Sequence, residues 1–181
     1  MTIDPLLHRL VVLALASLLL VAAGHKLANP ARFRVSLASY GLVPDALLGV
    51  GSILLPFVEF LIGGTLLSEN AGLTGAALRA CAILLFAYAG AIAVNLGRGN
   101  SQIDCGCLGS HAGKGELHWS MVARNVLLAS AAMVLSGVEP GAGARPLTWF
   151  DWINLGFAIA VLWLLYLGHE AWASLPRRER R

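Results

Sequence analysis

Charged side chains are scarce in this sequence, and their scarcity excludes most classes of soluble protein. Asp, Glu, Lys and Arg make up 13% of the 181 residues, while hydrophobic residues make up 57%. A soluble domain usually has about 25% charged residues. The sequence also lacks a phosphate-binding loop, a hydrolytic triad and a dinucleotide fingerprint. This composition is typical of an integral membrane protein.

Long polar segments are missing as well, which leaves no room for a separate soluble domain. A membrane core about 30 Å thick requires roughly 20 apolar residues per helix. We expect five spans, at about 10–24, 46–67, 76–96, 119–136 and 152–168, the fourth being the least regular because it contains Arg124 and Asn125. The predicted fold is an all-α membrane protein, in which residues 1–181 form one compact bundle of four to five helices. The first span also fits a cleaved signal peptide, since it follows Arg9 and ends in small residues.

Positive charges are distributed unevenly between the connecting segments. If the spans alternate in direction, one face carries Lys26, Arg32, Arg34, Arg98, Lys114, Arg177, Arg178, Arg180 and Arg181. The other face carries only Arg9, Arg145 and, near a span end, Arg79. The positive-inside rule therefore predicts a multi-pass protein of the bacterial inner membrane with the first face in the cytoplasm. The net charge of +3 does not indicate nucleic-acid binding, because the excess lies next to spans, where anionic lipid is the nearer partner.

Cysteine is also rare, yet two of the three cysteines are one residue apart in the polar segment NSQIDCGCLGSHAGKGELH, residues 100–118. A disulfide needs Cα atoms about 4.4–6.8 Å apart, and Gly106 permits the backbone bend that would bring Cys105 and Cys107 this close. So small a ring is expected to be strained, and strained disulfides are labile. The pair therefore favours thiol–disulfide exchange. Arg98 and Arg124 would favour the reactive thiolate, whereas Asp104 would oppose it.

Other interpretations of the same segment remain open. Cys105, Cys107, His111 and His118 offer the sulfur and nitrogen ligands that zinc accepts, although the Cys-x-Cys spacing is tighter than usual. The two cysteines would otherwise fill space in a loop or form a structural disulfide, which would close too short a loop to add much stability. Cys81, near the start of the third span, lies about one membrane thickness away and is expected to be an apolar helix residue.

Glu59 is an ionisable residue in the middle of the apolar stretch LLPFVEFLIGG. Such a residue is unfavourable in a membrane unless it is paired, protonated or next to a cavity. It therefore marks either a functional site or an interhelical contact that holds the bundle together. Lys26 lies too near the membrane surface to be its partner unless the first span is tilted or begins later. Gly63 and Gly64 would allow close approach of helices.

Four segments resemble the MauE (methylamine utilisation) family, within the broader DoxX-like group of small membrane proteins. They are GHKLANPARF, LPFVEFLIGGTLL, AVNLGRGNSQIDCGCLG and HWSMVARNVLL. The resemblance implies a role in maturing disulfide-rich periplasmic proteins, such as an amine dehydrogenase subunit, alongside a thioredoxin-like partner. It also implies that the redox pair is Cys105 and Cys107, flanked by Asp104, Gly106 and Gly109, with Lys26, Glu59, Arg98 and Arg124 as the polar framework.

Our hypothesis is an inner-membrane thiol–disulfide redox protein, with a non-catalytic assembly factor or a metal-binding or transport protein as the alternative. Quinone is a candidate electron acceptor by analogy with DsbB-type proteins, although the sequence shows no quinone-site motif. A transporter would be built around Glu59. The charge pattern places the cysteines toward the cytoplasm, whereas a periplasmic client would need them on the other side. Electron transfer across the membrane, as in CcdA-type carriers, would reconcile cytoplasmic cysteines with a periplasmic client. Alternatively, the charge pattern does not report the true orientation of this protein.

Overall fold

The computed structural model describes residues 4–68, 71–103, 117–138 and 148–174, and these ranges contain helices and no strand. Five of the helices are long, and one is short. In chain order they are α1 (Pro5–Ala28), α2 (Pro30–Ser39), α3 (Asp45–Leu67), α4 (Ala71–Gly97), α5 (Trp119–Ser136) and α6 (Trp149–Ser174). The protein is therefore an all-α membrane protein, as the composition predicts.

Local sequence explains where α1 begins and where α4 ends. Asp4 caps α1, since its Oδ1 accepts hydrogen bonds from the backbone N–H groups of Leu6 at 2.8 Å and Leu7 at 3.3 Å. At the other end of the bundle, Gly99 adopts a φ of 77°. This left-handed residue lets the N–H of Asn100 reach the carbonyl of Asn95 at 2.9 Å, which closes α4 with a Schellman motif.

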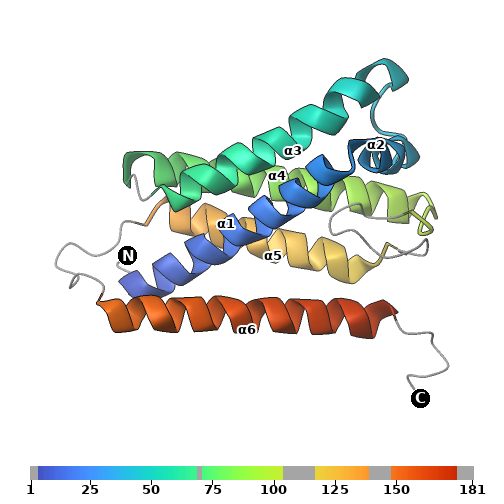
Figure 1. Cartoon of the computed structure of the whole chain (residues 1–181). Coiled ribbons are helices and arrows are strands. Elements are labelled where there is room, and N and C mark those ends of the chain that lie inside the picture. The colour runs from blue at the N-terminus through green and yellow to red at the C-terminus, as the bar shows by residue number, and fades with distance from the viewer. Residues whose placement is uncertain (1–3, 69–70, 104–116, 139–147, 175–181) are drawn as a thin grey trace.

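The helices pack as neighbouring pairs. α4 lies along α5, α1 lies along α3, and α6 lies along the outer side of α1 (Figure 1). One end of the bundle holds α2, the last turn of α1 and the last turn of α4 (Figure 1). The first turn of α1 and the last turn of α3 lie at the opposite end (Figure 1).

The centre of the bundle is apolar and built partly from small residues. Its buried members come from α1, α3, α4 and α5: Val12, Leu15, Ala16, Leu19, Ile62, Leu66, Ala77, Leu78, Cys81, Ala82, Leu85, Ala129, Ala132 and Leu135. Alanines on facing helices permit the close approach that membrane helices need in place of a hydrophobic driving force. α1 therefore supplies part of this core.

Among the described residues, four helices are long and apolar enough to cross a membrane: α1, α3, the stretch Gly72–Gly97 of α4, and α5. In α6, the stretch Trp149–Val161 forms a shorter apolar segment. The helices extend further than the predicted spans at α1, which begins at Pro5 and ends at Ala28, and at α6, which begins at Trp149 and ends at Ser174. The short helix α2 was not predicted.

Candidate functional site: a buried lysine, glutamate and tyrosine

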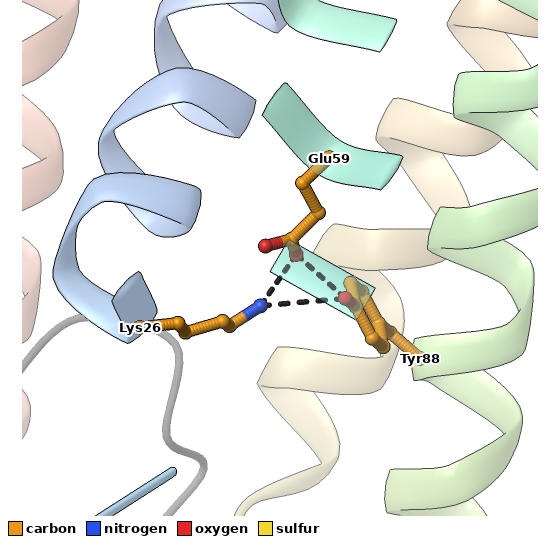
Figure 2. A network of polar contacts seen from close by, with 3 residues as sticks. All are labelled: Lys26, Glu59 and Tyr88. Atoms are coloured by element: carbon orange, nitrogen blue, oxygen red, sulfur yellow. Dashed lines mark hydrogen bonds and ion pairs between the residues drawn. The ribbon is translucent and has the colours of Figure 1, made fainter. Parts of the chain in front are cut away.

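Three polar side chains from three helices meet inside the bundle (Figure 2). Glu59 of α3 is completely buried, and Lys26 of α1 is 3% exposed. The Nζ atom of Lys26 forms an ion pair with Oε1 of Glu59. Tyr88 of α4 donates its hydroxyl to the same carboxylate oxygen at 2.6 Å, and the Lys26 ammonium donates to that hydroxyl at 3.3 Å. We call these three residues the polar cluster.

The environment of the cluster makes the ion pair strong and its separation unfavourable. The Lys26 ammonium lies 5.2 Å from the ring centroid of Phe33 and 4.9 Å from that of Tyr88, so aromatic faces add to its stabilisation. Few water molecules can solvate charges in such a place, so each charge depends on the other. The second carboxylate oxygen of Glu59, Oε2, is buried and has no hydrogen-bond partner among the described residues.

From the sequence, we expected Lys26 to reach Glu59 only if the first span were tilted or began later than predicted. α1 in fact begins earlier, at Pro5, and runs obliquely to α6 (Figure 1). The last turn of α1 lies beside the middle of α3. This position follows from the contact of Lys26 with Glu59, which is the fifteenth residue of a helix that begins at Asp45. α2 packs against the preceding part of α3 and places Phe33 over the ammonium group. Lys26 is thereby enclosed by protein.

A cavity of about 220 Å³ adjoins the polar cluster. Lys26 and Tyr88 form part of its wall, and aromatic and aliphatic side chains form most of the rest. The walls come from α2, α3, α4 and the turn between α2 and α3, including Phe33, Tyr40, Leu55, Leu84 and Ile92. The cavity is thus an apolar space with a charged pair at one side.

Residues 104–116, which include Cys105 and Cys107 and which we call the cysteine segment, are flanked by residues that pack close to this cavity. Ile103 and Leu117, on either side of residues 104–116, are both buried, and they pack with Ile92 and Tyr40. The N–H of Leu117 donates to the carbonyl of Ser101 at 2.7 Å, which ties the two flanks together. Ile92 and Tyr40 also line the cavity, so the two features share a wall.

The structure places the other predicted residues as follows. Cys105, Cys107, Asp104, Gly106, Gly109 and His111 lie outside the described residues. Arg98 is exposed just beyond the end of α4, Arg124 is half-buried in α5, and His118 precedes the first residue of α5. Within the part of the chain that the structure describes, His, Cys, Asp and Glu form no group of three that could hold a metal ion.

Cys81 is buried in the apolar core as a free thiol. It lies sixteen residues before Gly97, the end of α4, which corresponds to about 24 Å along a helix. This position agrees with the expectation that Cys81 is an apolar helix residue remote from the cysteine segment.

Sequence reasoning missed Tyr88 and Phe33 as members of the site. Tyr88 had a detectable signal, since it is a hydroxyl-bearing residue in the middle of the apolar stretch LLFAYAGAIAV. A buried tyrosine hydroxyl needs a partner, so it should have been considered together with Glu59. Phe33 had no comparable signal, because its role depends on where α2 folds.

Comparison of the sequence with known proteins identifies the family of this chain. Residues 4–137 match the family described as methylamine utilisation protein MauE. The chain belongs to the MauE family. A MauE protein of Paracoccus versutus is 34% identical over 175 residues, covering 97% of this chain and 91% of the relative. One from Methylorubrum extorquens is 34% identical over 165 residues, covering 91% and 85%, and one from Paracoccus denitrificans is 33% identical over 134 residues, covering 74% and 70%.

Family membership and the helices together make this MauE-family chain a multi-pass membrane protein. The matched region, residues 4–137, contains the whole polar cluster and the cysteine segment, but not α6. No solved structure matches the fold.

Proposed function

We propose that this protein is an inner-membrane thiol–disulfide redox protein of methylamine utilisation, which supports the maturation of disulfide-containing periplasmic proteins such as amine dehydrogenase subunits. The relatives are methylamine utilization proteins, which supports the pathway. The redox role rests on Cys105 and Cys107, with only Gly106 between them. The observation that carries the proposal is the anchoring of their segment, whose two flanks are buried and bonded to each other.

The proposed exchange is balanced between the cysteine pair and a thioredoxin-like partner. A thiolate of the reduced partner attacks the disulfide of Cys105 and Cys107, forming a mixed disulfide and releasing one loop thiolate. The second partner thiolate then attacks the mixed disulfide. The partner leaves as a disulfide and the loop as a dithiol, so two electrons move from partner to loop. The same steps in reverse oxidise the loop.

Replacement of the cysteines tests this function. In a host that requires this protein for growth on methylamine, C105S and C107S should each abolish growth, while the C81A control should grow normally because Cys81 is buried in the core. A single Cys-to-Ser variant should also trap a mixed disulfide with the partner, visible as a reducible band shift. Normal growth of the double variant C105S/C107S would exclude the redox role and favour an assembly factor.

Labelling with a membrane-impermeant thiol reagent determines which side of the membrane bears the cysteine pair. Labelling of Cys105 and Cys107 in intact cells after reduction would place the pair in the periplasm and support direct exchange there. Labelling only in inverted vesicles would place it in the cytoplasm and require electron transfer across the membrane. The positive-inside rule favours the cytoplasmic placement because nine positive residues share that face. Lys26 is one of the nine, and its burial in an ion pair removes it from this count.

A further inference from the structure

The cavity beside the polar cluster has the properties of a ligand site, and the proposed redox role does not depend on it. Its volume is about 220 Å³. A dry protein cavity of about 150 Å³ is large enough to bind benzene. The space therefore has room for one substituted six-membered ring. Several walls are aromatic, from Phe33, Tyr40 and Tyr88, which favours a flat occupant.

The polar wall of the cavity defines which chemical group the occupant presents. An ammonium group has three N–H donors, and among the described residues the ammonium of Lys26 contacts two acceptors, Glu59 and Tyr88. A third donor remains for a ligand. The adjacent carboxylate of Glu59 would repel an anion, so the matching group is a neutral acceptor such as a carbonyl oxygen.

The surroundings of the cavity define how the occupant reaches it. Leu42 and Ala87 line the cavity and are exposed on the surface of the bundle. Ala87 lies on α4, a helix long and apolar enough to cross a membrane. An apolar molecule dissolved in the lipid would therefore enter between α4 and the turn that joins α2 to α3 without crossing water.

We propose that this cavity binds a membrane-soluble ring compound with a neutral carbonyl group, of the chemical class of the quinones. The ring would lie between the aromatic walls, and one carbonyl oxygen would accept a hydrogen bond from Lys26. Glu59 and Tyr88 hold the ammonium in place through the contacts drawn in Figure 2.

Saturable binding of decylubiquinone to the full-length protein in lipid nanodiscs tests the proposal. We expect binding of one molecule per chain, with competition by other short-tailed benzoquinones and none by decanoate. Two phenylalanine substitutions on α4 form a matched pair. A87F fills the mouth of the cavity and should weaken binding at least tenfold, whereas A76F places the same side chain on an exposed site outside the cavity and should leave binding unchanged.

A charge-neutral double variant tests the polar wall separately from the cavity's shape. K26M/E59Q removes both members of the ion pair, which avoids leaving one charge buried alone. Loss of a hydrogen bond from a charged donor should weaken binding about tenfold. Thermal unfolding of the double variant checks that its bundle is intact. Saturable binding of decanoate in place of the quinone would show that the cavity holds a lipid acyl chain. Equal affinity in A87F, A76F and the unmodified protein would place any quinone site elsewhere, and either result would overturn the proposal.

Discussion

The two ends of α4 lie in very different surroundings. Leu78 and Cys81, toward its start, are buried among apolar side chains of α1, α3 and α5. Tyr88 and Asn95, toward its end, lie among hydrogen-bonding partners. The first region has the packing that any stable membrane bundle needs. The second contains buried charges and a cavity, neither of which stability alone would require.

This difference separates the part of the bundle that supports the fold from the part that is specialised. A well-packed apolar substitute for a buried ion pair is often as stable as the pair or more so. A cavity of about 220 Å³ also gives up packing contacts. Both features occur together where α2 covers α1 and α3, and the cysteine segment is anchored to the same wall. Their coincidence is our reason for placing the proposed function at this end of the molecule.

The largest expected effect comes from breaking the ion pair on one side only. K26M should lower the free energy of unfolding by about 3–5 kcal/mol, because it leaves the Glu59 carboxylate buried without its cation. Unfolding of the detergent-solubilised protein by a denaturing detergent would measure this change.

The double variant K26M/E59Q is the control for that loss. It should recover most of the stability, since no uncompensated charge remains. If K26M alone were as stable as the unmodified protein, the polar cluster would make no energetic contribution to the fold.

In the apolar region, L78A should be the next most damaging change. Leu78 is 1% exposed in the core, and truncation of a buried leucine costs about 2–5 kcal/mol through lost contacts and the cavity that remains. L73A is its matched control on the same helix, because Leu73 is 51% exposed and lipid can fill the space it leaves. Equal losses in thermal unfolding would contradict the assignment of these two faces of α4.

Long helices of this fold were predictable because their physical cause is local. Each needs only a run of about 20 apolar residues, and α3 and α5 begin and end within one residue of the predicted spans, 46–67 and 119–136. The short helix α2 was missed because it is neither long nor apolar, although Asn29 followed by Pro30 is typical of a helix start.

The candidate site was predictable only in part. Glu59 could be selected, since a lone carboxylate in an apolar span needs an explanation. Its partners depend on how far one helix is displaced along another, and hydropathy contains no such information. Lys26 appeared too close to the end of its span, but the oblique course of α1 and the cover provided by α2 place it deep in the protein. The cysteine pair was selected from its spacing and from the family resemblance, lies outside the described residues, and stays a prediction.

Adjacent glycines on α3 provide a sharper comparison between a packed and an open site. A Cβ at Gly63 would lie 2.9 Å from Cγ of Leu20 and 3.2 Å from the carbonyl oxygen of Ala16, whereas a Cβ at Gly64 would meet nothing within 4 Å. G63A should therefore separate α1 from α3 and lower stability by about 1–3 kcal/mol. G64A should be neutral or slightly stabilising, because alanine is the better helix former. Thermal unfolding of both variants would check this, and equal effects would show that α1 and α3 do not approach closely at Gly63.

Removing one hydroxyl from the polar cluster should have the smallest effect. Y88F keeps the aromatic ring beside the Lys26 ammonium and leaves the ion pair with Glu59 in place. It removes two interhelical hydrogen bonds, the one donated to Glu59 and the one accepted from Lys26, and such bonds in membrane proteins contribute about 0.6 kcal/mol each on average. We therefore expect a loss of about 1 kcal/mol in the free energy of unfolding, measured under the same conditions as K26M. A loss as large as that of K26M would mean that the hydroxyl, rather than the ion pair, holds the three helices together at this point.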